Sequence, residues 1–160
     1  MPTASFVDLR LAQCKGTERL RAGLDVVDVT QVRNSMEHFG QRFLNRLFTE
    51  GEVAYALEGR ERCAERLAAR FAAKEAAIKA FSLGEIGVNW RDLEVRKLPD
   101  GSCRLALHGR AASEALRLGV CDIALSLSHD GDYAAAVVTA VCSAAAADPI
   151  PENKQPCSSK

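Results

Sequence analysis

The segment "RFAAKEAAIKAF", residues 70–81, predicts the central element of the fold, a long helix. Alanine and other strong helix formers fill it, and the same composition extends upstream to about residue 64. Four large apolar residues recur at the spacing of one helical face: Leu67, Phe71, Ile78 and Phe81. We therefore expect a helix over residues 64–81 that packs one stripe against the rest of the domain.

The same segment also carries charges that an apolar face does not need. Lys74 falls inside the apolar stripe, with Glu75 and Lys79 beside it. In one interpretation, Lys74 lays its alkyl chain along the core and Glu75 pairs with Lys79, which is worth only ~0.2–0.5 kcal/mol. In the other, Glu75 and Lys79 belong to a functional site.

A short upstream stretch favours the functional interpretation. "AGLDVVDV", residues 22–29, suits a buried strand, but Asp25 places a carboxylate inside it. If this strand packs on the helix, Asp25 and Glu75 approach each other and call for a cation or a shared proton. The cation that suits oxygen ligands is Mg²⁺, which takes one or two carboxylates together with substrate phosphates. Lys79, one turn beyond Glu75, would then reach another phosphate oxygen.

The remaining segments predict an α+β domain with helices packed on a largely antiparallel sheet. Thr30 is placed to cap a first long helix, and "TEGE" has the form of a capping box. Turn residues and alternating apolar positions indicate two hairpins, at residues 90–109 and 121–141. A short helix is expected between them, at residues 110–118. We expect the domain to span residues 21–142, between a polar extension over residues 1–20 and a disordered tail over residues 143–160.

Composition narrows the class of protein. The chain has 160 residues, 48% hydrophobic, with 21 Lys and Arg against 21 Asp and Glu, as in a globular protein rather than a nucleic-acid binder held by bulk charge. Its six cysteines form no C-x-x-C pair, and we expect reduced thiols in a cytoplasmic protein. We find neither a secretory signal nor a membrane-spanning stretch, so no membrane partner is expected.

Other polar residues admit two interpretations each. "SLSHDGD", residues 126–132, offers the hydroxyl of Ser128 and the imidazole of His129 to a phosphate, or is simply a polar strand end. Arg70, at the edge of the apolar stripe, suits packing and an anion contact equally. His38 and His108 are expected at the surface without a role.

Four segments in this order, "GLDVVDV", "RFAAKEAAIKAF", "WRDLEV" and "SLSHDGDYAAAVV", resemble the holo-acyl-carrier-protein synthase type of 4′-phosphopantetheinyl transferase over about residues 22–141. The resemblance implies transfer of 4′-phosphopantetheine from coenzyme A to a serine of an acyl carrier protein, with release of adenosine 3′,5′-bisphosphate. It also implies a homotrimer with sites between subunits.

The resemblance assigns roles to individual residues. Asp25 and Glu75 match the magnesium ligands, Lys79 matches the lysine at the phosphates, and Ser128 and His129 match the segment near the coenzyme. Glu75 and Lys79 are therefore the candidate catalytic residues. We add Arg70 as a candidate coenzyme contact. The acceptor of the serine proton is left open between Glu75 and a metal-bound water.

The chain departs from the family pattern where the carrier protein docks. Basic residues are common directly after the strand, but here Thr30 and Gln31 follow it, and Arg33 is the nearest substitute. We expect an acidic carrier to meet Arg42 and Arg46, which share a helical face. The loop "SLGEIG" (82–87) also has fewer glycines than the family's loop. The rival hypotheses are a non-catalytic scaffold for carriers or nucleotides and a magnesium-dependent hydrolase of a small pyrophosphate.

Overall fold

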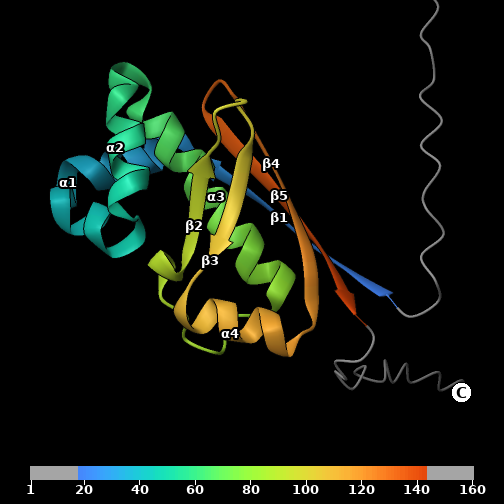
Figure 1. Ribbon diagram of the computed structural model, residues 1–160. Helices are drawn as coiled ribbons and strands as arrows, with labels where there is room; N and C mark the ends of the chain where they lie inside the picture. Colours follow the sequence, from blue (N-terminus) through green and yellow to red (C-terminus); the bar gives the residue numbers. More distant parts are fainter. Residues whose placement is uncertain (1–17, 144–160) are drawn as a thin grey trace, which may run out of the picture.

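The computed structural model describes residues 18–143 and has the α+β architecture predicted from the sequence (Figure 1). The elements, in chain order, are β1 (Glu18–Asp28), α1 (Val29–Leu47), α2 (Glu50–Glu58), the 3₁₀ turn η1 (Arg60–Arg62), α3 (Cys63–Phe81), the 3₁₀ turn η2 (Trp90–Asp92), β2 (Leu93–Lys97), β3 (Cys103–Leu107), α4 (Gly109–Arg117), β4 (Val120–Asp130) and β5 (Tyr133–Ser143).

The strands form two antiparallel sheets. One has the order β1-β5-β4, and the other is the β2–β3 hairpin. β1 begins at Glu18 and β5 ends at Ser143, so the sheet extends slightly beyond the expected domain limits at both ends. The rest of the predicted extension and tail, residues 1–17 and 144–160, lies outside the described residues.

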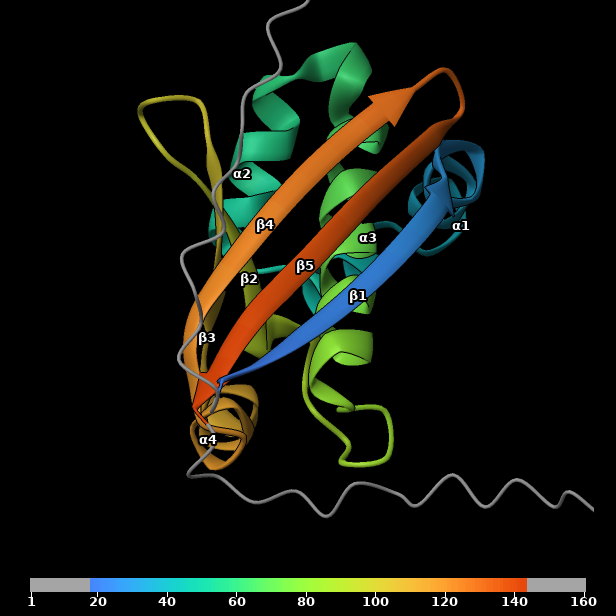
Figure 2. The same cartoon turned by 90° about the vertical axis from the view of Figure 1, so that its right-hand side faces the viewer.

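Helix α3 covers one face of the three-stranded sheet. Figure 2 shows β1, β5 and β4 side by side with the helices behind them. The inner face is built from small residues, including Ala134, Ala136 and Ala140 of β5, which are almost fully buried. A Cβ on Gly23 of β1 would lie only 2.0 Å from the carbonyl oxygen of Ala76 in α3. Only glycine permits this approach of strand and helix.

The opposite face of this sheet has large apolar side chains in the open. Alternation along β1 turns Gly23 and Asp25 toward α3 and Leu24 and Val26 away from it. Leu20 is 73% exposed, and Leu24 and Val26 are each 57% exposed. No helix of the described chain covers this face (Figure 2).

Helix α1 differs from expectation at its start and in its middle. Its cap is Asp28 rather than Thr30, since the Thr30 amide donates to Asp28 Oδ1 at 2.7 Å. Gly40 then interrupts the helix with φ 52° and ψ −132°, a conformation open to glycine. Arg33 and Arg42 therefore lie on the two sides of a break and not on one continuous helix.

The capping box before α2 is confirmed, and its acid has a second role. Thr49 Oγ1 accepts from the Glu52 amide, while Glu52 Oε2 accepts from the Thr49 amide at 2.9 Å. Glu52 also accepts from Lys74 Nζ at 2.9 Å and from the Val95 amide at 2.9 Å.

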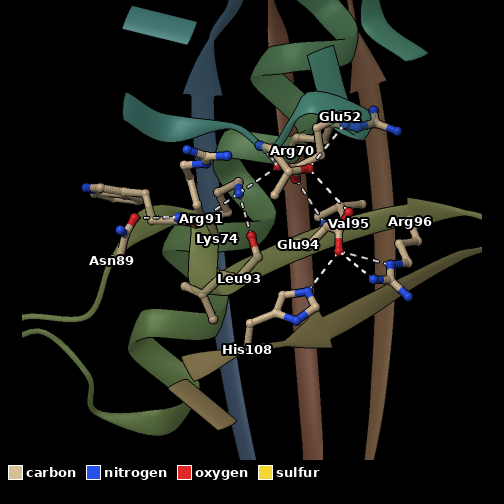
Figure 3. Close-up of polar contacts among 12 residues, drawn as sticks. Glu52, Arg70, Lys74, Asn89, Arg91, Leu93, Glu94, Val95, Arg96 and His108 are labelled. Atoms are coloured by element: carbon tan, nitrogen blue, oxygen red, sulfur yellow. Dashed lines mark hydrogen bonds and ion pairs between the residues drawn. The ribbon is translucent and has the colours of Figure 1, made fainter. Parts of the chain in front are cut away.

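Lys74 lies wholly in the core, with a side chain 0% exposed, so its charged end is buried together with the alkyl chain. Its ammonium also donates to the carbonyls of Trp90 and Leu93, which accounts for all three of its protons (Figure 3). Burial lowers the pKa of Lys74, and the Glu52 carboxylate opposes that shift. The lysine thus ties α3 to α2 and to the β2 hairpin.

Candidate active site

The ion pair that closes the strand–helix contact joins Lys79 of α3 to Asp25 of β1. Lys79 Nζ lies 2.7 Å from Asp25 Oδ1 and 3.1 Å from the carbonyl oxygen of Leu24. The expected pairing of Lys79 with Glu75 along the helix is therefore replaced by a bond between elements. The hydrogen bond to Asp25 raises the pKa of Lys79, so the ammonium is charged at neutral pH.

Glu75 is the third member of this group. It is half-buried on α3, and burial, followed by repulsion from Asp25, raises the pKa of its carboxyl, while Lys79 opposes the shift. The three side chains line one cleft of about 540 Å³. Its other lining residues come from the end of β1, the start of α1, α3 and β5: Val26, Val27, Asp28, Gln31, Phe71 and Tyr133.

The close contact at Gly23 explains how residues 50 positions apart come to meet. Gly23 and Asp25 lie on the same face of β1, and Ala76 and Ala80 on α3 take up the space next to Gly23. Glu75 and Lys79 directly precede Ala76 and Ala80 in the sequence. The contact that brings these alanines to Gly23 therefore also brings Glu75 and Lys79 near Asp25. The sequence-based prediction that Asp25 and Glu75 approach each other agrees with this arrangement.

The carboxylates of Asp25 and Glu75 are too few to hold a metal ion by themselves. They suit a cation that a bound substrate also coordinates. Within residues 18–143, no three His, Cys, Asp or Glu side chains come together as a metal site would need. Two carboxylates beside an open cleft match Mg²⁺, which keeps waters and completes its octahedron with substrate phosphate oxygens. Asp25 and Glu75 could hold such an ion.

A second cleft, of about 420 Å³, is strongly basic; we call it the arginine cleft. Its cationic and titratable lining comes from η1, α3, β2 and β4: Arg62, Arg66, Arg70, Lys97 and His129, with Glu65 as an acid. Tyr55, Ser102, Cys103 and Ser126 are also in the lining.

Arg70 is the buried member of this cleft, only 3% exposed. Its guanidinium carbon lies 4.1 Å from the centre of the Tyr55 ring, and its Nη1 donates to the Arg66 carbonyl at 3.0 Å. Its Nε has no hydrogen-bond partner, the one such buried side-chain atom among the described residues. Burial lowers the pKa of Arg70, whereas Tyr55, Glu52 and Cys103 oppose the shift. A buried cation with an unused donor suits an anionic ligand.

The candidate residues therefore fall into two groups within one chain. Asp25, Glu75 and Lys79 share the first cleft, as predicted. Arg70 and His129 line the arginine cleft instead. Ser128, exposed on β4, lines neither cleft.

The sequence-based prediction included Arg70 but missed Arg62, Arg66 and the Tyr55 ring that lies between Arg66 and Arg70. Arg62, Arg66 and Arg70 recur at four-residue intervals, which places them along one helical face and could have indicated an anion site. Arg66 also lies 4.4 Å from the Tyr55 ring centre, so the tyrosine is held between two guanidinium groups.

The expected docking arginines are all exposed on α1. Arg46 lines a cleft with the loop that leads to β2, including Asn89, Trp90 and Arg91. Trp90 in turn stacks on Phe71 at 5.2 Å between ring centres, and Phe71 lines the cleft of Asp25. The basic surface of α1 and the acid pair are thus linked by one aromatic contact. His108, to which the sequence analysis assigned no role, forms a hydrogen bond between its Nε2 and Glu94 Oε2 at 2.8 Å.

Comparisons with known proteins identify relatives of the chain. Residues 21–138 match the family model of the 4′-phosphopantetheinyl transferase superfamily. The chain is 43% identical over 121 residues to a holo-[acyl-carrier-protein] synthase of Gloeobacter violaceus, covering 76% of this chain and 92% of that protein. It is 47% identical over 108 residues to the corresponding synthase of Solibacter usitatus, covering 67% of this chain and 86% of that protein.

A solved structure gives the same result at the level of the fold. The chain superposes on an ACPS–CoA complex from Chronobacterium ammoniagenes with a TM-score of 0.66 and 34% identity, covering 76% of this chain and 96% of the other. Among the residues that the structure describes, no helix has the length and apolar character needed to cross a membrane.

Proposed function

The chain belongs to the 4′-phosphopantetheinyl transferase superfamily, and we propose that it transfers 4′-phosphopantetheine from coenzyme A to a serine of an apo acyl carrier protein, releasing adenosine 3′,5′-bisphosphate. The observation that carries this proposal is the meeting of Asp25, Glu75 and Lys79 in one cleft. Two acids and a lysine are what a pyrophosphate needs: a cation held by the acids, and a fixed charge beside it.

Asp25 and Glu75 would hold Mg²⁺ against the pyrophosphate of coenzyme A. When bound, this ion neutralises phosphate charge and makes the phosphorus easier to attack. Lys79 is already oriented by Asp25 and Leu24, so its ammonium faces the leaving phosphate without reorganisation. The serine proton would pass to Glu75 or to a water beside it.

The arginine cleft would hold the other phosphate of the coenzyme. Arg70 offers an unused donor there, and His129 lines the same cleft. We propose that these two residues bind the adenosine 3′,5′-bisphosphate portion, and that Ser128 contacts the coenzyme from the opposite sheet face of a neighbouring subunit.

A homotrimer with sites between subunits would reconcile the two clefts, and we propose this assembly. The exposed Leu20, Leu24 and Val26 give β1 an apolar face that a second copy of the chain would cover. A cyclic assembly then sets the acids of one subunit against the arginine cleft of the next.

We propose that Arg42 and Arg46 receive the acidic carrier. Replacing both with Ala should raise KM for the carrier about tenfold and leave kcat nearly unchanged, because rim charges mainly govern encounter. Arg110→Ala on α4 is the control. If the Arg42/Arg46 double variant and Arg110→Ala changed KM for the carrier equally, α1 would not be the docking surface. The free thiols of the described cysteines fit a reducing location, and we propose the cytoplasm.

Mass spectrometry of an apo carrier protein incubated with coenzyme A and Mg²⁺ tests the function. We expect the carrier to gain the phosphopantetheine mass with the native chain and not with Glu75→Gln. A scaffold would leave every carrier tested unmodified. A pyrophosphate hydrolase would split coenzyme A at the same rate with or without a carrier.

A further inference from the structure

Cys103, the first residue of β3, lines the arginine cleft. It is a free, half-buried cysteine that shares the lining with Arg66, Arg70 and Lys97. Cys103 is also one of the groups that counter the burial-induced lowering of the Arg70 pKa, which places it within electrostatic range of that guanidinium. None of the roles assigned to the cleft uses this sulfur.

The cleft itself selects what can reach the thiol. The buried Arg70 keeps an Nε donor without a partner, and further cations surround it. A concave basic site raises the local concentration of small anions by about 10-fold or more. A small molecule that carries both negative charge and a reactive sulfur is therefore delivered to Cys103.

We propose that Cys103 is a reversible modification site for small anionic disulfides, and that its modification closes the arginine cleft. The Cys103 thiolate attacks one sulfur of the disulfide, a new Cys103–sulfur bond forms, the original sulfur–sulfur bond breaks, and the second half leaves as a thiolate. No net oxidant is needed beyond the disulfide. A reducing thiol reverses the exchange.

The regulatory part of this inference rests on the proposed function. The attached group brings its own negative charge to the guanidinium groups and occupies the volume that the coenzyme phosphate would fill. Modified enzyme should then bind coenzyme A poorly while the acid pair around Lys79 stays intact.

The other described cysteines lack this combination. Cys63 and Cys142 are buried, and burial raises the pKa of the Cys63 thiol. Cys121 is exposed, but it lines a different cavity with an apolar wall that includes Leu105 and Leu116. It therefore serves as an internal control that any reagent can reach.

Peptide mapping by mass spectrometry tests the site on the full chain without a carrier. The probes are oxidised glutathione, which is anionic, and 2-hydroxyethyl disulfide, which is neutral. We expect the ratio of modification at Cys103 to that at Cys121 to be about tenfold higher with the anionic probe. Equal ratios for the two probes would overturn the proposal, as would absence of label at Cys103.

Protection and activity separate this site from the proposed function. Adenosine 3′,5′-bisphosphate should slow labelling of Cys103 and not that of Cys121. After oxidised glutathione, native enzyme should lose most of its transfer activity and regain it with dithiothreitol, whereas Cys103→Ser should keep its own untreated rate. Charge-selective labelling without protection would uphold the thiol site and count against the coenzyme assignment. If oxidised glutathione also inactivated Cys103→Ser relative to its own untreated rate, the regulatory role would be refuted.

Discussion

Glu75 occupies a position that costs stability, and we propose that it binds the metal. Burial and the neighbouring Asp25 raise the pKa of its carboxyl, with Lys79 giving only partial relief. A raised acid pKa means that the folded state holds the proton to higher pH than the unfolded state does. Stability is therefore lost as pH rises from the ordinary value of 4.5 through the folded pKa, and the loss persists at neutral pH.

Glu75→Gln should consequently stabilise the metal-free protein. We expect its Tm to exceed that of the native chain at about pH 7 and the difference to shrink toward about pH 4, where the native carboxyl is protonated. Mg²⁺ at about ten times its Kd should add roughly 1.4 kcal/mol to the native chain and much less to the variant. Scanning calorimetry with and without Mg²⁺ measures both effects. A lower metal-free Tm for the variant would refute this account of Glu75.

Lys74 carries a stabilising role that the neighbouring charges do not. Lys74→Met would remove three hydrogen bonds and leave Glu52 as a buried, unpaired acid, which typically costs about 3–5 kcal/mol. Urea denaturation should show this loss, and Glu52→Gln in the same chain should restore part of it. Lys97→Met, at an exposed position, is the matched control. Similar midpoints for Lys74→Met and Lys97→Met would contradict the network.

At the scale of elements, the contact between β1 and α3 sets the geometry of the acid pair. A Cβ on Gly23 would lie 2.0 Å from the Ala76 oxygen and 2.8 Å from the Ala80 nitrogen, both backbone atoms that cannot rotate away. Gly23→Ala should therefore separate strand from helix, lower stability by about 1–3 kcal/mol and weaken Mg²⁺ binding, because Asp25 moves with the strand. Urea denaturation and metal titration give the two readouts.

Gly84→Ala supplies the control for this change, because its Cβ would meet nothing within 4 Å. It should leave the stability and the Mg²⁺ affinity near those of the native chain. If the two alanine variants behaved alike, the close approach of β1 and α3 would not be what positions Asp25.

Elements with a strong periodic pattern were predictable from the sequence. The α3 helix was expected at residues 64–81 and spans Cys63–Phe81, and both hairpins occur where turn residues and alternation indicated them. The interruption at Gly40 was not predictable from periodicity, because a glycine can lie inside a helix or break it. The division into two sheets was not predicted either. Alternation along a strand shows which side chains share a face, but it does not show which strands pair with each other.

The site was predictable in part, for a physical reason. A carboxylate in an apolar strand has few acceptable partners, so Asp25 pointed to the charges on α3. The sequence did not determine the partner of Lys79, which could pair along its helix or with the strand. In the structure, β1 packs across α3 and Lys79 pairs with Asp25. Lys74 illustrates the opposite limit, because its partners Glu52, Trp90 and Leu93 are brought together only by tertiary packing.

At the scale of the whole molecule, the function that we propose requires the two clefts to bind one substrate. Coenzyme A carries a pyrophosphate and a further phosphate on the ribose, and the chain has two separate places for such charges. The trimer that we propose joins the acid pair of one subunit to the arginine cleft of another. In that arrangement, a defect in one cleft can be compensated by a neighbour with a defect in the other.

Mixing two inactive variants tests this arrangement directly. Glu75→Gln removes a proposed metal ligand, and His129→Ala removes a proposed coenzyme contact in the arginine cleft. Each homotrimer should transfer slowly. In each cyclic mixed trimer, a site works when the subunit that gives the acids carries only the His129 change and its neighbour only the Glu75 change, which occurs at one of the three interfaces, or about one third of the sites. Co-expressed chains with different tags, purified on both, should recover activity of that order. Analytical ultracentrifugation checks that mixed trimers form. If mixed trimers form and stay as slow as either parent, both clefts of one chain must serve the same coenzyme, and the shared site would be wrong.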